Sequence, residues 1–277
     1  MNFLISYHYA SKEDLTDLRE VMGPEALLFL DSGAFSAASQ GVPIDLSKYI
    51  EFCKETSGIY SICANLDVIG DAHATLVNQI CMERSGLNPM PVFHIGEPWE
   101  YLQHYVDTYS YVGLGGLVGR HNNARIPFLD RCFKMAAEGH KKPGFHGFGC
   151  TSWELICRYP WKSVDSSSWT SGVRFNRFSL FRPELARTRA SWYTCPLGGR
   201  DILKHGYLVR AYGFSTYGLV QPSRERNLVT SLSMASWYEA EKHKQKSDPE
   251  FNLFLADTQV KDIRGSLNTL RKKGYPI

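Results

Sequence analysis

LLFLDSGAFS, at residues 27–36, begins as a short apolar run and ends in a carboxylate followed by small residues. Apolar runs of about four to eight residues between turn signals are typical of buried strands. Seven further runs of this kind occur, and nearly all end in a small or polar residue: residues 3–6, 61–67, 91–94, 111–116, 143–149, 162–165 and 251–257. The chain therefore has eight candidate strands.

Helix-compatible stretches separate most of these strands. The first has Ser11 and Asp14 at the spacing of a capping box, and all are apolar at helical intervals: residues 11–22, 45–55, 71–85, 98–108 and 123–138. Strands that alternate with helices pair in parallel through crossover connections. Eight such units favour an α/β fold of the (β/α)8, TIM-barrel type, with an open doubly wound sheet as the alternative.

A length of 277 residues fits one barrel domain over residues 1–277. The interval 166–250, between the last two strands, is much longer than a usual connection. Within it, residues 174–181 alternate like a strand, and 223–245 have the pattern of a long helix. We therefore expect an insertion at about 171–250, before the last strand.

Positive charge is concentrated in the later half of the chain. Residues 1–110 hold 5 Lys and Arg against 15 Asp and Glu, and residues 111–277 hold 26 against 13. Residues 171–230 have ten Lys and Arg against three acids, interleaved with aromatic residues. This composition indicates either a nucleic-acid surface, where Arg binds phosphates and rings stack on bases, or a solvated face over core aromatics. The candidate phosphate contacts are Arg174, Arg177, Arg182, Arg187, Arg189 and Arg200.

Composition also excludes several classes of protein. An apolar fraction of 43% with 21% charged residues argues against disorder. No run approaches the roughly 18 apolar residues of a membrane-spanning helix, and the first residues, MNFLISYHYASKEDL, lack the features of a secretory signal. Seven cysteines without a C-x-x-C pair form neither a disulfide framework nor a zinc module. We expect a cytoplasmic protein with no membrane partner and no structural metal.

Polar residues and glycines stand at the carboxyl ends of several predicted strands. In a closed parallel barrel these ends converge on one mouth, where side chains are often functional. Each residue also has an ordinary explanation, because an Asp can cap a helix, a His can be a hydrogen-bonded wall residue and a Gly pair can form a tight turn. The residues are Asp31, Asp67, His94, Gly115, Gly116, His146 and Asp165.

Three segments, taken in order, resemble the tRNA-guanine transglycosylase superfamily. They are LFLDSGAFS at 28–36, YVGLGGLVG at 111–119 and HGFGCTSWELICRYPWKSVDSSSW at 146–169, and the first is the most specific. The closer likeness is to the shorter, often phage-encoded DpdA-type proteins, which insert 7-deazaguanine bases into DNA. The resemblance implies a (β/α)8 barrel that exchanges guanine for a 7-deazaguanine without cutting the backbone and without a cofactor.

The resemblance also assigns roles to individual residues. Asp165 falls on the position of the catalytic nucleophile, Asp31 on the general acid/base and Asp67 on the aspartate that recognises the base. Ser32 and Phe35 belong to the same pocket, with the Phe35 ring against the base. The other pocket residues are Gly115, Gly116 and Leu117, which form the G-G-L segment, and the wall residues His94 and His146.

Two carboxyl groups suit this chemistry. Breaking an N-glycosidic bond develops positive charge on the sugar, and a carboxylate beneath C1′ can hold the sugar as a covalent ester. The departing base gains a proton and the incoming base loses one, so one acid/base residue can serve both steps. The target base must first leave its helical stack.

The chain departs from the tRNA enzymes in ways that favour DNA. Their zinc site, a C-x-C-x-x-C run with a later His, is absent because only Cys195 follows the nucleophile position. Their helical C-terminal portion is replaced by the basic insertion. We therefore expect DNA and a free 7-deazaguanine base as partners. The alternatives are a tRNA-directed exchanger, a catalytically silent nucleic-acid-binding barrel and a (β/α)8 glycoside hydrolase.

Overall fold

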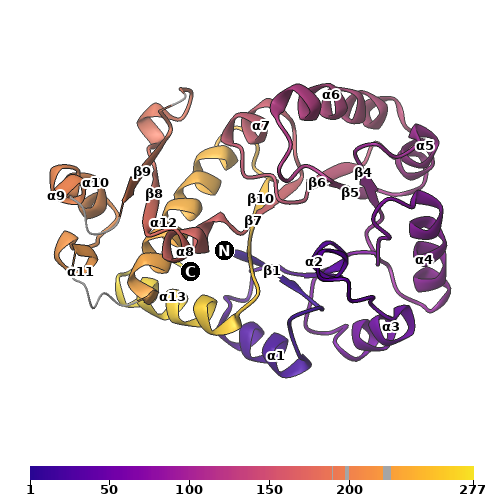
Figure 1. Cartoon of the computed structure of the whole chain (residues 1–277), viewed down its shortest axis with the longest axis horizontal. Helices are drawn as coiled ribbons and strands as arrows, with labels where there is room; N and C mark the ends of the chain where they lie inside the picture. Colours follow the sequence, from indigo (N-terminus) through magenta and orange to yellow (C-terminus); the bar gives the residue numbers. More distant parts are fainter. Residues whose placement is uncertain (189, 197–199, 221–225) are drawn as a thin grey trace.

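Eight parallel strands form one curled sheet at the centre of the molecule (Figure 1). The computed structural model describes residues 1–188, 190–196, 200–220 and 226–277. The strand order is β3-β2-β1-β10-β7-β6-β5-β4. The strands are β1 (Asn2–Ser6), β2 (Leu28–Asp31), β3 (Ile62–Cys63), β4 (Val92–His94), β5 (Tyr111–Gly115), β6 (Gly144–Gly147), β7 (Ser163–Ser166) and β10 (Asn252–Asp257). Six of them lie within the runs that the sequence predicts, whereas β1 begins one residue before its run and β7 ends one residue after its run.

The two edge strands of the sheet meet at a single parallel bridge. Next to β3 and β4, Asn65 donates its backbone N–H to Met90 O at 2.9 Å, and Met90 donates to Cys63 O at 2.8 Å. The other seven pairs of neighbouring strands have regular ladders. The sheet is thus compatible with the expected (β/α)8 fold, although no full ladder closes it. The consecutive strand order differs from that of a doubly wound sheet, in which the order reverses.

Helices surround the outer face of the curl (Figure 1). The predicted helices are present with nearly the expected bounds: α1 (Lys12–Val21), α3 (Leu46–Glu55), α4 (Ala72–Arg84), α5 (Trp99–Thr108) and α6 (Asn122–Glu138). The capping box of α1 is confirmed, because Ser11 Oγ accepts from Asp14 N at 3.2 Å while the Asp14 carboxylate accepts from Ser11 N at 2.9 Å. Outside the interval 166–250, three further helices are not anticipated by the sequence pattern: α2 (Ala34–Gln40), α7 (Trp153–Arg158) and α13 (Val260–Lys272).

The segment between β7 and β10 contains a small hairpin and several short helices at one side of the sheet (Figure 1). Its described elements are η1 (Ser168–Thr170), α8 (Ser171–Arg174), β8 (Arg177–Phe181), η2 (Pro183–Leu185), β9 (Trp192–Pro196), α9 (Arg200–Lys204), α10 (Gly206–Ala211), α11 (Thr216–Val220) and α12 (Arg226–Gln245). The strand expected at 174–181 begins three residues later, because a helical turn precedes it. The long helix expected at 223–245 corresponds to α12. Residues 223–225 of the expected helix lie outside the described residues.

The helix α12 packs against α13 and also contacts β10. It therefore belongs to the helical layer around the sheet, and its buried face covers the last strand. None of the helices in the described parts of the chain combines the length and the apolarity that a bilayer span requires.

Apolar side chains fill the interior of the curl. Leu4, Phe29 and Phe254 form a buried cluster there with Ala64 and Met90. Side chains alternate along a strand, so a residue two positions after an inward one also points inward, one layer nearer the carboxyl end. This alternation brings polar side chains to the carboxyl end of the sheet, above an apolar floor.

Candidate active site at the carboxyl ends of the strands

Three carboxyl groups lie together where the strands end. Asp31 ends β2, Asp165 lies in β7, and Asp67 lies in the loop after β3. The pKa of Asp31 is raised from 3.8 to about 7, mainly by burial and also by the neighbouring charges of Asp67 and Asp165. Because the charges of both other carboxylates affect the pKa of Asp31, the three carboxyl groups lie close to one another. The structure therefore brings together the three aspartates that the sequence singles out.

The D-S-G turn after β2 holds Asp31 in place. Gly33 donates its backbone N–H to Asp31 Oδ2 at 3.0 Å, which partly counters the rise in the Asp31 pKa. Gly33 has φ of +81°, and a Cβ there would lie 2.2 Å from Ser6 Oγ and 2.5 Å from His8 Cβ. Only glycine fits at this position, because both the backbone conformation and the available space exclude a side chain.

Asp67 is oriented by a histidine that lies between two carboxylates. His94 Nε2 is 3.0 Å from Asp67 Oδ2, and His94 Nδ1 is 3.0 Å from Glu97 Oε1. Ser32 donates its hydroxyl to Asp67 Oδ1 at 3.2 Å. Burial lowers the pKa of His94, but hydrogen bonds and charge from Asp67 and Glu97 outweigh it and raise the pKa to about 9. The imidazole is therefore charged at neutral pH, and His94 is a positioning residue for Asp67.

Glu97 is a member of this group that the sequence analysis does not anticipate. Its second oxygen, Oε2, accepts the backbone N–H of His94 at 2.8 Å, so one carboxylate fixes both the ring and the end of β4. The signal in the sequence is the spacing of three residues between His94 and Glu97 in VFHIGEP.

The glycine pair makes room for the histidine. A Cβ on Gly115 would lie 2.4 Å from His94 Cδ2, and a Cβ on Gly116, whose φ is +74°, would lie 2.7 Å from Ile95 Cγ2. These glycines thus let β4 and its histidine lie close against β5. Leu117 is only 1% exposed, so its side chain packs in the core and only its backbone can face a ligand.

Asp165 stands above a buried polar chain. Gly149 donates its backbone N–H to Asp165 Oδ1 at 2.7 Å. His146 Nε2 lies 3.4 Å from the same oxygen, close enough for an ion pair but not aligned for a hydrogen bond. Below it, His146 Nδ1 is 2.6 Å from Ser163 Oγ, which in turn is 2.5 Å from the Tyr111 hydroxyl. The sequence analysis does not anticipate Ser163 or Tyr111.

His146 is fully buried, and aromatic rings surround its imidazole. Phe29, Phe148 and Phe254 have ring centroids 4.8, 4.5 and 6.0 Å from it. The residue is therefore part of the apolar floor beneath the carboxyl groups and reaches them only through Asp165.

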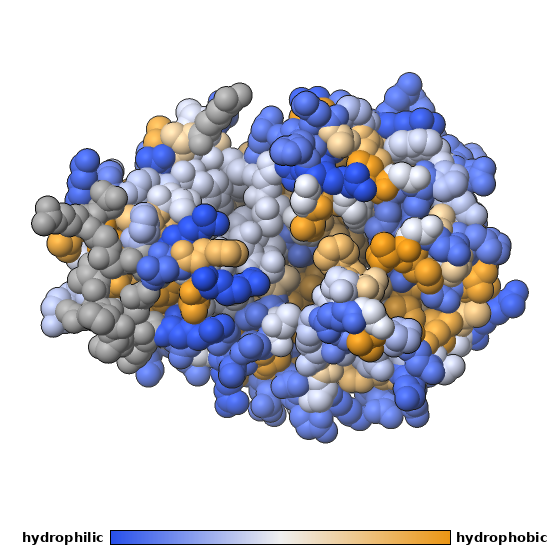
Figure 2. All heavy atoms as spheres, viewed as in Figure 1, coloured by the Kyte–Doolittle hydropathy of each residue, from blue (hydrophilic) through white to orange (hydrophobic). Residues whose placement is uncertain are grey.

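Exposed apolar side chains follow several of the strand ends. Phe35, on α2, is 65% exposed. The others are Tyr9 after β1, Val68 and Ile69 after β3, Val118 after β5 and Phe175 after β7. In the view of Figure 2, apolar surface gathers around a hollow near the centre of the molecule. A ring at the position of Phe35 is available to stack on a ligand.

The predicted phosphate-binding arginines do not form one continuous group. Arg174 and Arg177 are exposed close after β7, and the Arg177 guanidinium lies 5.2 Å from the centroid of the Phe175 ring. Arg182 is half-buried, and Arg187 lines a separate cavity on the flank of the sheet. Arg189 and the side chain of Arg200 lie outside the described residues.

Over the ranges that the structure describes, no group of three or more His, Cys, Asp and Glu side chains could hold a metal ion. No protein-family model matches the chain, and no curated protein is similar to it. The likeness to the transglycosylases therefore rests on the motifs in the sequence.

Proposed function

We propose that this protein exchanges bases on DNA, replacing a guanine with a 7-deazaguanine such as 7-cyano-7-deazaguanine through a covalent aspartyl–sugar ester. The observation that carries the proposal is the grouping of Asp31, Asp67 and Asp165 at the carboxyl end of the sheet. The order and roles of these residues follow the motif resemblance. The contacts around each aspartate are consistent with a separate task for each.

Asp165 is the proposed nucleophile. Its Oδ1 accepts the Gly149 N–H and faces His146, so the carboxyl group is held in one orientation. No residue in the described parts of the chain donates a hydrogen bond to Oδ2, and this oxygen is the one proposed to attack C1′. Attack forms the sugar ester as the bond from C1′ to guanine breaks, and the second base reverses the step.

Asp31 is the proposed acid/base. A pKa of about 7 gives both its protonated and its ionised form substantial populations near neutral pH. The protonated form can give a proton to the departing guanine, and the carboxylate that remains can take one from the incoming base. One residue thus serves both halves of the exchange.

Asp67 is the proposed base-recognising residue. The N1–H and exocyclic amine of a guanine edge are adjacent donors that match a carboxylate acceptor. Ser32 donates to Oδ1 of this carboxylate, and charged His94 lies next to Oδ2. Glu97 in turn holds His94, so the selectivity for the base depends on residues that do not touch it.

Incubating the purified protein with radiolabelled 7-cyano-7-deazaguanine and either DNA or tRNA tests the proposal. We expect label in DNA, and a covalent protein–DNA adduct that Asp165→Asn abolishes. Asp17→Asn, at an exposed carboxylate on α1, is the matched control and should keep full exchange. Label in tRNA but never in DNA contradicts the assigned polymer, and full exchange by Asp165→Asn contradicts the assigned nucleophile.

A further inference from the structure

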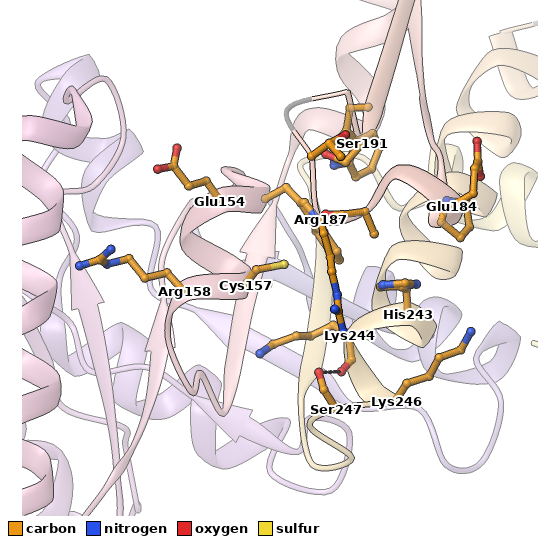
Figure 3. Close-up of a pocket in the computed structure, with 15 residues that line it drawn as sticks. Glu154, Cys157, Arg158, Glu184, Arg187, Ser191, His243, Lys244, Lys246 and Ser247 are labelled. Carbon is orange, nitrogen blue, oxygen red and sulfur yellow. Dashed lines mark hydrogen bonds between the residues drawn. The ribbon is translucent and has the colours of Figure 1, made fainter.

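A cavity of about 1140 Å³ lies on the flank of the sheet (Figure 3). Its walls are α7, the segment between β8 and β9, and the end of α12 with the turn that follows. Residues 246–251 connect the end of α12 to the first residue of β10, so this wall lies near the amino end of the strand. The candidate active site is at the opposite, carboxyl end, and the cavity is therefore a separate feature.

The walls carry more positive than negative charge. Arg158 pairs with Asp130 at 3.3 Å, and Lys244 pairs with Asp248 at 3.5 Å. Arg187 and Lys246 make no ion pair with any residue of the described ranges, although both line the cavity. Two cations are thus left without a carboxylate partner inside one concave surface.

The acidic side chains of the cavity do not neutralise Arg187. Figure 3 shows Arg187 reaching across toward the end of α12, whereas the carboxylates of Glu154 and Glu184 point away from it. Cys157 lies on the opposite wall, on α7. The space next to the guanidinium is therefore lined by uncharged and basic groups.

The pKa of His243 reflects the positive charge of this cavity. Burial lowers its pKa, and the charges of Lys246 and Arg187 lower it further. Its Nδ1 atom is buried and has no hydrogen-bond partner among the described residues. The hydroxyl groups of Thr188, Ser191 and Ser247 also line the cavity. Thr188 and Ser247 donate their hydroxyls to Leu185 O and Lys244 O, so the groups left to bind phosphate oxygens are the two cations and the Ser191 hydroxyl.

We propose that this cavity binds the phosphate backbone of a nucleic-acid strand, with Arg187 and Lys246 as the cationic contacts. The choice of a nucleic acid rests on the proposed base exchange, whereas the chemistry of phosphate binding rests on the cavity itself. The cavity gives the nucleic-acid strand a contact outside the catalytic centre, on the flank between α7 and α12. Base pairing plays no part there, so binding is independent of sequence.

The affinity of a fluorescently labelled single-stranded DNA oligonucleotide, measured by anisotropy over a series of salt concentrations, tests this inference. Each phosphate contact contributes about 0.7 to the slope of log affinity against log salt. The double variant Arg187→Ala/Lys246→Ala should therefore have a slope smaller by about 1.4, and an affinity about 25-fold lower at 0.1 M salt. Near 1 M salt the variant and the wild type should bind equally.

Arg84→Ala/Lys134→Ala is the matched control, because it removes the same charge from exposed positions on α4 and α6. It should keep the slope of the wild type to within a few tenths. Equal slopes for the two double variants overturn the inference, as does a wild type that binds no oligonucleotide. Base exchange is assayed separately, so a protein that binds DNA through the cavity without exchanging bases would contradict only the proposed activity.

Discussion

Asp31 is the residue at which function and stability oppose each other. Its carboxyl group has a pKa of about 7 in the folded chain, against an ordinary value of 3.8. Above the ordinary value the unfolded chain ionises the group while the folded chain keeps it protonated, so stability falls as the pH rises from about 4 to about 7. A group that must be ready to give and take a proton is thus held where its ionised form is costly.

Asp31→Asn should therefore stabilise the protein at alkaline pH while abolishing exchange. At about 1.4 kcal/mol per pKa unit, ionised Asp31 costs the folded state up to about 4 kcal/mol at pH 8. Urea unfolding of the variant and the wild type at pH 4 and pH 8 measures this difference. The gain should be small at pH 4 and largest at pH 8. A gain that does not depend on pH would show that burial does not raise the Asp31 pKa.

The contact between β4 and β5 shows how two neighbouring strands build a site that neither strand encodes alone. His94 on β4 and Gly115 on β5 are register partners, and the ring of one occupies the space where the other lacks a side chain. The sequence analysis singles out both residues and assigns both to the pocket for the base. The structure shows that the histidine is the nearest neighbour of the glycine.

Gly115→Ala should destabilise the protein because the new Cβ would lie 2.4 Å from His94 Cδ2. Overpacking of this kind costs about 1 to 3 kcal/mol. In a His94→Ala background the space is free, so the same substitution should cost almost nothing, and a double-mutant cycle by urea unfolding measures the coupling. Gly58→Ala is the control, because a Cβ there meets no atom within 4 Å. Additive effects of the two substitutions would contradict the contact.

The eight strands of the large sheet and six of the helices could be predicted because each is encoded within a few consecutive residues. The run before Asp31, and the cap of α1 at Ser11 and Asp14, are local signals of this kind. The chain of contacts from Tyr111 through Ser163 to His146 could not be predicted. Those contacts depend on side-chain directions that exist only once the sheet is curled.

The architecture of the whole molecule depends on how the two edges of the curled sheet meet. Strand order follows from the alternation of strands and helices, but the seam between β3 and β4 depends on the length and tilt of two very short strands. The backbone pairing between them is the bridge between Ala64 and Met90, which lies within the same interior cluster as Phe29. Asp67 and His94, which flank this seam, are joined across it by their own ion pair. The site therefore contributes to holding the edges of the sheet together.

Hydrogen exchange should show the seam as the weakest part of the sheet. The amides of Asn65 and Met90 are buried, but each makes one hydrogen bond outside any ladder, so a local opening releases both. We expect them to exchange faster than the amides of β1 and β10, which pair on both sides. His94→Ala removes the ion pair across the seam and should speed their exchange further while leaving β1 unchanged. Seam amides as slow as those of β1 in both proteins would mean that the sheet opens only by global unfolding.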